Sequence, residues 1–257
     1  MTSEGRGGEG SPPWAPARVA TVGPRSHGER GTTTGVGARS LVLVRHGQTD
    51  WNVEGRYQGH TDVPLNETGR MQARALGARL RSLRTTRALF DPARTAVLSS
   101  DLRRATETAT LAFGVEGRRL HVDAGLREIR FGAFEGLTEE HADARFPGSL
   151  AAWHHGDAHV ALPGGETRAQ ASARALAAIA AFAERTEAPS VVVVTHGAVL
   201  RLLVATCFDD GAIPWRVAFP NTVAHRVRLD GARWSYERAL LPEWLRDLRD
   251  HARRDSR

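Results

Sequence analysis

Lysine is absent from this chain, and cysteine occurs only once, at Cys207. A single cysteine excludes an intramolecular disulfide and a zinc site built from several cysteines. The lack of lysine excludes the phosphate-loop lysine of nucleoside triphosphatases and the Schiff-base lysine of aldolases and pyridoxal enzymes. The His-Glu-x-x-His pattern of zinc peptidases is missing as well. Any phosphate chemistry must therefore rest on arginine and histidine, and we expect no metal and no cofactor.

Long apolar runs are also missing, since no stretch approaches the roughly 20 apolar residues that span a bilayer. Residues 1–39 hold nine of the 26 glycines and four of the 12 prolines. This composition is typical of a disordered extension, and it lacks the apolar core of a secretory signal. A targeting peptide or a start codon placed too far upstream are alternatives, although three glutamates argue against the former. We expect one domain over residues 40–257, in the cytoplasm and without membrane contact.

The formal net charge of +6 raises the question of nucleic-acid binding. Five arginines fall within residues 1–39, and Arg253, Arg254 and Arg257 close the chain. Neither cluster is interleaved with aromatic residues, and no motif for binding RNA or DNA is present. We therefore expect no nucleic-acid partner, whereas a basic surface would attract anionic phosphate esters.

Two apolar runs end in a similar polar pattern. Residues 41–44 (Leu-Val-Leu-Val) are followed by Arg-His-Gly, and residues 191–194 (four valines) are followed by Thr-His-Gly. A short apolar run that stops at a turn signal predicts a buried strand. Parallel strands bring their carboxyl ends to one edge of a sheet, so His46 and His196 could face one site. The alternative is that each histidine is merely a satisfied residue at the end of a strand.

A further strand and helix are predicted between these two runs, over residues 96–109. One of the polar residues 99–101 can cap the first turn of this helix. A helix N-terminus carries partial positive charge and free N–H groups, which suit a phosphate. Arg103 lies about 100° around the helix from Arg104, and we expect it to be a solvated surface charge.

Four strings in the chain resemble the signature segments of the histidine phosphatase superfamily, the phosphoglycerate mutase-like proteins. They are Arg-His-Gly-x-Thr at 45–49, Ser-x-Leu-x-Arg-Ala at 100–105, Leu-x-Glu-x-x-x-Gly-x-x-Glu-Gly at 126–136, and Thr-His-Gly at 195–197. The resemblance extends over roughly residues 40–241. It implies an enzyme that transfers a phosphoryl group to a histidine.

The resemblance also implies a role for individual residues. His46 would attack phosphorus through its far ring nitrogen, while a backbone carbonyl holds the other nitrogen. Glu128 would protonate the leaving alcohol and then act as base for water, and Glu135 would be structural. Burial and nearby arginines act oppositely on the protonation of Glu128, and the sequence leaves the outcome open. The implied catalytic residues are His46, Glu128, Arg45, Arg104 and His196. The implied phosphate-binding residues are Arg45, Asn52, Gln58, Gly59, Arg104, His196 and Gly197.

The fold expected from these patterns is an α/β three-layer sandwich. Asn66 can cap a helix that runs to about residue 83, and the alanine-rich residues 167–185 are strong helix formers. Asp-Gly within residues 223–236 predicts a hairpin, and Pro242 would open a terminal helix. Strands alternating with helices predict a mostly parallel central sheet, to which the hairpin adds an antiparallel edge.

The short stretch between Glu128 and His196 favours a phosphatase over a mutase. The cofactor-dependent mutases that resemble this chain carry a long insertion there, with a Gly-Leu-Asn-Lys stretch and an Arg-Arg pair that clamp the substrate. Here the corresponding residues 136–139 contain no lysine, and Arg145 is the only arginine between residues 137 and 166. We expect a phosphomonoesterase that hydrolyses small phosphate esters through a phosphohistidine intermediate.

Two other functions stay open: cofactor-dependent phosphoglycerate mutase-type phosphoryl transfer, and an inactive family member that binds phosphorylated ligands. The expected partner is a small phosphate ester, and a homodimer is left open. Whether residues 153–155 (Trp-His-His) shape a substrate lid is left open, and for the pair His154 and His155 a polar surface loop is the favoured interpretation.

Overall fold

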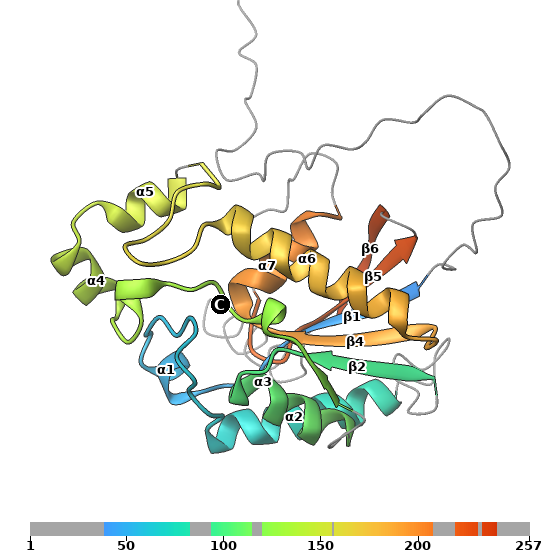
Figure 1. The fold of residues 1–257 in the computed structure, drawn as a ribbon. Helices are drawn as coiled ribbons and strands as arrows, with labels where there is room; N and C mark the ends of the chain where they lie inside the picture. Colours follow the sequence, from blue (N-terminus) through green and yellow to red (C-terminus); the bar gives the residue numbers. More distant parts are fainter. Residues whose placement is uncertain are drawn as a thin grey trace, which may run out of the picture.

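A computed structural model describes residues 39–82, 94–114, 120–155, 157–207, 219–230 and 233–240. Helices cover both faces of a central sheet of six strands (Figure 1). The strands are β1 (Arg39–Arg45), β2 (Thr95–Ser99), β3 (Leu120–Val122), β4 (Ser190–Thr195), β5 (Ala224–Asp230) and β6 (Arg233–Leu240). The α-helices are α1 (Asp50–Val53), α2 (Glu67–Ser82), α3 (Arg103–Phe113), α4 (Glu139–Arg145), α5 (Ser149–His155), α6 (Arg168–Arg185) and α7 (Gly197–Ala205), and the 3-10 turns are η2 (Ala124–Leu126) and η3 (Gly132–Phe134).

The sheet has the order β3-β2-β4-β1-β5-β6. Strands β1 to β4 are parallel, whereas β5 pairs with β1 and β6 pairs with β5 in antiparallel fashion. β4 lies between β1 and β2, and its last residue, Thr195, is directly opposite Arg45. The predicted mostly parallel sheet with an antiparallel edge is confirmed.

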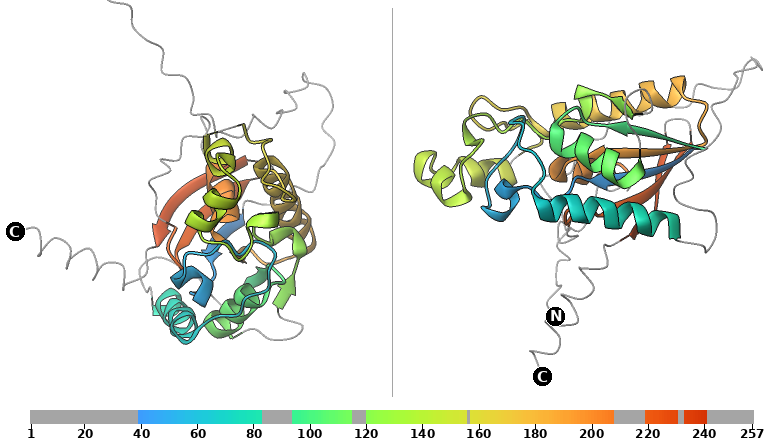
Figure 2. Two further views of the ribbon diagram at one scale, coloured as in Figure 1. Left: turned by 90° about the vertical axis from the view of Figure 1, so that its left-hand side faces the viewer. Right: turned by 90° about the horizontal axis from the view of Figure 1, so that it is seen from below.

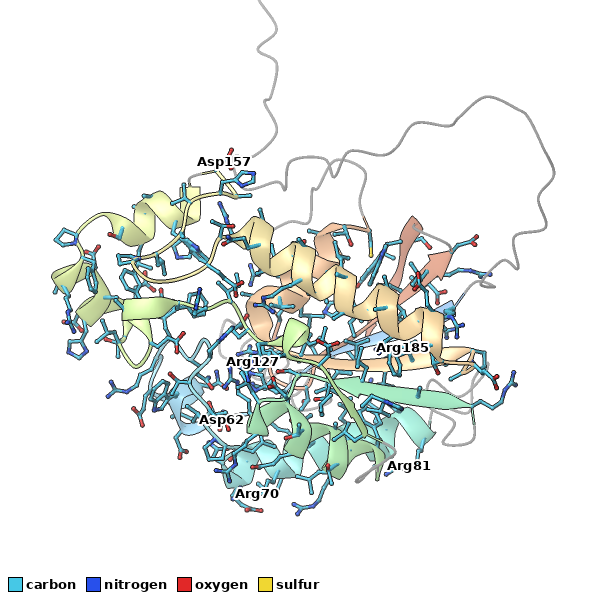
Figure 3. The ribbon with its side chains drawn as sticks, viewed as in Figure 1. Asp62, Arg70, Arg81, Arg127, Asp157 and Arg185 are labelled. Carbon is cyan, nitrogen blue, oxygen red and sulfur yellow. The ribbon has the colours of Figure 1, made fainter. Side chains whose placement is uncertain are left out.

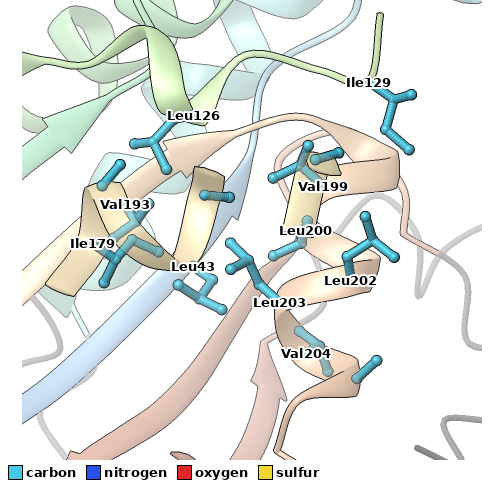
Figure 4. Packing of buried hydrophobic residues seen from close by; sticks show 14 of the residues in the cluster. Leu43, Leu126, Ile129, Ile179, Val193, Val199, Leu200, Leu202, Leu203 and Val204 are labelled. Atoms are coloured by element: carbon cyan, nitrogen blue, oxygen red, sulfur yellow. The ribbon is translucent and has the colours of Figure 1, made fainter. Parts of the chain in front are cut away.

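The core is divided by the sheet into two halves because strand side chains alternate between its faces. Leu41 and Leu43 of β1 pack with α6 and α7 on one face (Figure 4), and Val42 and Val44 pack with α2 and α3 on the other. Figures 1 and 2 show α1, α4 and α5 beyond the carboxyl ends of β1 and β4. A site at the carboxyl edge of the sheet would therefore lie between the strand ends and this extra group of helices.

The predicted helices and the hairpin are present, with their ends shifted by one to four residues, since α3 continues to Phe113 and β6 to Leu240. The Asn66 side chain accepts a hydrogen bond from the N–H of Gly69 at 2.9 Å, which caps α2. Thr167 and Gln170 form a reciprocal capping box at the start of α6. β5 and β6 pair along their length, as the hairpin prediction requires.

The predicted cap of α3 is wrong. The N-cap of the helix is Leu102, which follows the predicted cap residues 99–101 in the sequence. No side chain of those residues caps the first turn. Instead, the carboxylate of Asp62, labelled in Figure 3, accepts the N–H of Arg103 at 2.7 Å. This carboxylate comes from a segment far away in the sequence, and it occupies the N–H that could otherwise bind a phosphate.

Two predictions lie outside the described residues, namely the nature of residues 1–38 and the helix that Pro242 would open. Within the part of the chain that the structure describes, no helix combines the length and apolar character needed to cross a membrane.

Candidate active site

The two His-Gly strand ends meet, as their patterns predict. β1 and β4 are adjacent and parallel, and the N–H of His46 donates to the carbonyl of Thr195 at 3.0 Å. The rings of His46 and His196 are 5.1 Å apart, centroid to centroid. Both side chains are buried, at 3% and 0% exposure. Two histidines that are far apart in the sequence therefore share one small volume at the carboxyl edge of the sheet.

His46 is held as a neutral imidazole with a defined tautomer. Its Nδ1 lies 2.6 Å from the carbonyl oxygen of Gly47, which can only accept, so Nδ1 carries the proton. The remaining nitrogen, Nε2, then has a free lone pair. Burial lowers the pKa of His46 well below its usual range, and the charges of Arg104 and Arg45 lower it further. The ring is thus neutral at neutral pH, and the lone pair of Nε2 is available.

Arg104 is completely buried, and every one of its guanidinium nitrogens makes a hydrogen bond. Its Nε donates to Nδ1 of His196 at 3.1 Å, and its two terminal nitrogens donate to the carbonyls of Thr61 and Gly59 at 2.8 and 2.7 Å. Burial lowers the pKa of Arg104 to about 10, which leaves it charged at neutral pH. Arg103, by contrast, is exposed and forms an ion pair with Glu107, as expected of a surface charge.

The bond from Arg104 also sets the tautomer of His196. Because Nδ1 accepts this bond, the proton of the neutral ring lies on Nε2. Nε2 is buried and makes no hydrogen bond to protein. Burial lowers the pKa of His196 well below its usual range, and the nearest arginine, Arg104, adds to this effect. His196 therefore offers one N–H donor beside His46.

Arg45 provides a second cationic group close to His46. It donates to the carbonyl of Phe219, and its Nε is buried without a partner. Burial lowers the pKa of Arg45, although the carboxylate of Glu128 acts in the opposite direction. A side chain on Gly197 would place its Cβ 3.2 Å from Nε of Arg45. Gly197 thus leaves room for Arg45, and its contact with phosphate stays a prediction.

Glu128 lies at the same site, with both carboxylate oxygens held by backbone N–H groups. Oε1 accepts from Ile129 and Val199 at 2.9 and 3.2 Å, and Oε2 accepts from Ala198 at 3.1 Å. Ala198 and Val199 belong to the first turn of α7, whose N-terminus therefore stabilises this carboxylate. Glu128 is 9% exposed, and it lies in the wall of the cavity together with Arg45 and Arg104.

A cavity of about 140 Å³ opens between these groups. Its walls contain six of the predicted site residues and three that the sequence reasoning missed. The six are Arg45, His46, Asn52, Gln58, Arg104 and Glu128, and the three are Arg56, Tyr57 and Phe131. His196, Gly59 and Gly197 do not line it but lie directly behind its wall.

Gly59 supports the cavity from behind. Its φ of 51° is in the left-handed region that favours glycine, and its carbonyl orients Arg104. A Cβ at this position would lie 2.1 Å from Oε1 of Glu135. The carboxylate of Glu135 accepts N–H bonds from His60, Thr61 and Phe131, so it fixes this loop, in agreement with the structural role expected for it.

The comparisons with known proteins agree with this geometry. A model of the histidine phosphatase superfamily (branch 1) matches residues 41–240. The chain belongs to the histidine phosphatase superfamily. It is a phosphatase of the α/β class that the motifs predicted.

Several relatives of this histidine phosphatase are named for their activity. It is 39% identical over 191 residues to glucosyl-3-phosphoglycerate phosphatase of Mycobacterium tuberculosis H37Rv, covering 69% of this chain and 79% of the relative. It is 33% identical over 200 residues to phosphoglycerate mutase-like protein 4 of Arabidopsis thaliana, covering 77% and 83%.

Solved structures show the same fold. The structure of mycobacterial glucosyl-3-phosphoglycerate phosphatase in complex with VO3 superimposes with a TM-score of 0.64 at 33% identity, over 77% of this chain and 97% of that one. YhfR from Bacillus stearothermophilus gives 0.64 at 33% identity, over 77% and 95%.

Sequence reasoning also missed Asn221 of this histidine phosphatase. Its Nδ2 donates to the backbone carbonyl of His46 at 3.0 Å and to Oδ1 of Asn52 at 3.2 Å. Asn52 in turn forms a capping box with Thr49 at the start of α1. Asn221 therefore connects His46 to the amide that lines the cavity, and no motif near residue 221 signals this.

The interpretation of His154 and His155 as part of a loop is wrong, although His154 is exposed at the surface. These residues end helix α5, and Trp153 is buried at 6% exposure. Its ring packs edge-on against Phe131, with centroids 5.8 Å apart. Because Phe131 lines the cavity, α5 supports the cavity wall through this aromatic contact.

Proposed function

We propose that this enzyme hydrolyses small phosphate monoesters in two steps, through a phosphoryl group carried on Nε2 of His46. The observation that supports this best is the state of His46: a buried, neutral ring, fixed at Nδ1 by a carbonyl, beside the guanidinium groups of Arg45 and Arg104. A phosphate ester resists attack because it is anionic, and fixed positive charge reduces this resistance.

In the first step, Nε2 of His46 attacks phosphorus, and the bond from phosphorus to the ester oxygen breaks. Arg45 and Arg104 would bind the phosphoryl oxygens. His196, behind the wall of the cavity, would orient the guanidinium group of Arg104. The departing oxygen takes a proton from the carboxyl group of Glu128. In the second step, Glu128 takes a proton from water as the water oxygen attacks phosphorus, which releases inorganic phosphate and restores neutral His46.

Mutase-type transfer is the second candidate, because relatives of that name match this chain over most of its length. A mutase must hold a bisphosphate and return the phosphoryl group to it. The described residues of the stretch 137–166, which would have to supply such a clamp, contribute nothing to the wall of the cavity. Arg145, its one arginine, lies over the ring of Phe146 at 5.5 Å. These observations favour water as the acceptor.

The substrates that fit this cavity are small polar phosphate esters. Beyond the phosphate position its wall offers one guanidinium, one phenol and two amides, from Arg56, Tyr57, Asn52 and Gln58. Such groups suit hydroxyl and carboxylate substituents. Phosphorylated glycerates and their glycosides, the class named for the mycobacterial relative, are therefore the first esters to test. The cytoplasm and the absence of a metal requirement remain predictions from the sequence.

A panel of phosphate esters tests this proposal, with turnover measured by phosphate release. Hydrolysis should persist in the presence of a chelator and be abolished by His46→Ala. His159→Ala is the matched control, because His159 is exposed and outside the cavity. Rapid acid quenching with labelled substrate should place the phosphoryl label on His46. A label on another residue, or activity that is lost with chelator and restored by metal, would contradict the mechanism.

A further inference from the structure

One arginine outside the cavity holds the segment that carries Glu128. Arg174, in the middle of α6, donates to the carbonyls of Gly125 and Arg127 at 2.7 Å each and to that of Glu128 at 2.8 Å. These three carbonyls belong to the turn η2 and the irregular chain after it, where no regular helix or strand supplies donors. The guanidinium group of Arg174 thus directly fixes the backbone of residues 125–128, which we call the catalytic segment.

Glu166 completes this arrangement from the other side. Its carboxylate accepts from Nε and a terminal nitrogen of Arg174, and from the N–H of Arg130 at 2.8 Å. The N–H of Glu166 also donates to the carbonyl of Arg130 at 2.9 Å. Burial alone would raise the pKa of Glu166, but the bonds from Arg174 and Arg130 lower it overall. The ionised pair therefore holds the chain both before and after Glu128.

Among the described residues, no hydrogen bond or ion pair joins Arg174 to the carboxylate of Glu128, so Arg174 sets the position of this carboxylate through the backbone. The side chain of Glu128 is placed by N–H groups of Ile129 and of α7. A shift of the main chain at residues 125–128 would draw the carboxylate away from these donors and from the ester oxygen. A misplacement of about 1 Å can cost about 10²-fold in rate, because proton transfer needs close alignment.

We propose that Arg174, oriented by Glu166, is a positioning residue for proton transfer by Glu128. It fixes the three carbonyls of the catalytic segment and so sets the distance between the Glu128 carboxyl group and the leaving oxygen. The phosphate site formed by Arg45, His46 and Arg104 does not depend on this contact, because its hydrogen bonds go to other segments. The inference rests on the proposed two-step hydrolysis.

The test compares Arg174→Met with wild-type enzyme on an alkyl phosphate and on an activated aryl phosphate. For the alkyl ester, kcat should fall about 10²-fold, because its basic leaving group needs the proton of Glu128. For the aryl ester, the burst of phenolate should keep its rate, while the slower hydrolysis of phosphohistidine falls and phosphoenzyme accumulates. Inhibition by inorganic phosphate should be unchanged. Arg185→Met is the control, because Arg185 is exposed at the far end of the same helix (Figure 3).

A double-mutant cycle with Glu128→Gln separates positioning from general damage. If Arg174 acts through Glu128, then adding Arg174→Met to Glu128→Gln should reduce the alkyl-ester rate by less than threefold, because interacting residues are non-additive. Equal losses for the burst and for the alkyl ester, or fully additive effects, would overturn the proposal. Should Arg174→Met fail to fold, Glu166→Gln serves instead, with a smaller loss in the same pattern. A wild-type enzyme with no burst and no ester hydrolysis would instead refute the two-step function itself.

Discussion

His225 is expected to make the fold sensitive to acid. This histidine of β5 is fully buried, and its Nε2 has no hydrogen-bond partner. Its Nδ1 lies 3.2 Å from the hydroxyl of Tyr236, and the ring of Phe219 lies 4.8 Å from its own. Burial lowers the pKa of His225 to about 4. A proton on this ring would leave a charge without a counter-ion inside the core.

The sign and size of the effect follow from the two pKa values. The folded pKa lies below the unfolded one, so between them the unfolded chain binds more protons than the folded chain. The stability that the neutral His225 contributes is therefore fully present above the unfolded pKa of about 6.5. It is lost as the pH falls toward 4. From about pH 7.5 to pH 5, His225 alone should reduce the free energy of unfolding by about 2 kcal/mol. For a domain of this size that corresponds to roughly 4–8 °C in Tm.

The replacement His225→Phe keeps a ring in the core and removes the titration. Urea unfolding at both pH values should show a loss on acidification that is smaller than the wild-type loss by about 2 kcal/mol. His46 and His196 shift in the same direction and account for part of the loss that remains. His159→Phe, at an exposed position, should behave like wild type. An identical acid-induced loss in wild type and His225→Phe would refute the reasoning.

Three further predictions concern the catalytic residue, the N-terminal residues and the loop behind Arg104. Glu128→Gln should slow alkyl phosphates by about 10²–10⁴-fold and activated aryl phosphates far less in a burst assay, and equal losses would remove Glu128 from acid–base catalysis. A chain that starts at Gly37 should keep the wild-type Tm and kcat. A large fall in either would show that the removed N-terminal residues contribute to the fold. Gly59→Ala should lower the free energy of unfolding by about 1–3 kcal/mol and reduce kcat, because the new Cβ would lie 2.1 Å from Oε1 of Glu135. Gly55→Ala is the control: residue 55 has the same left-handed backbone but no atom nearby, so comparing the two variants isolates the effect of the contact.

The parts of the site that sequence could predict are those with a local pattern. The strand ends at His46 and His196 are visible because apolar runs stop at a turn signal, and parallel pairing then brings them together. Arg104 was found by its helical context and a family string. Glu128 was found only through the resemblance, because one carboxylate among 29 acidic residues carries no signal of its own.

The parts that could not be predicted depend on contacts between distant segments. Asn221 acts on the backbone of His46 across 175 residues, and Asp62 replaces the local cap of α3. Arg174 lies in an alanine-rich helix, where an arginine is usually interpreted as a solvent-exposed charge. Its partners are backbone carbonyls, which every residue has, so no side-chain pattern marks them.

The central position of β4 governs when the enzyme can first become active. β4 is inserted between β1 and β2, two strands that precede it by roughly 150 and 95 residues, respectively. During synthesis, β1 and β2 leave the ribosome long before their shared neighbour exists. His196, which accepts a hydrogen bond from Arg104, comes directly after the end of β4. Folding must therefore wait for a late, non-local pairing, which is a slow class of event. The rate at which activity returns during refolding would then measure how fast β4 inserts between β1 and β2. Nascent chains that end before residue 196 would be inactive.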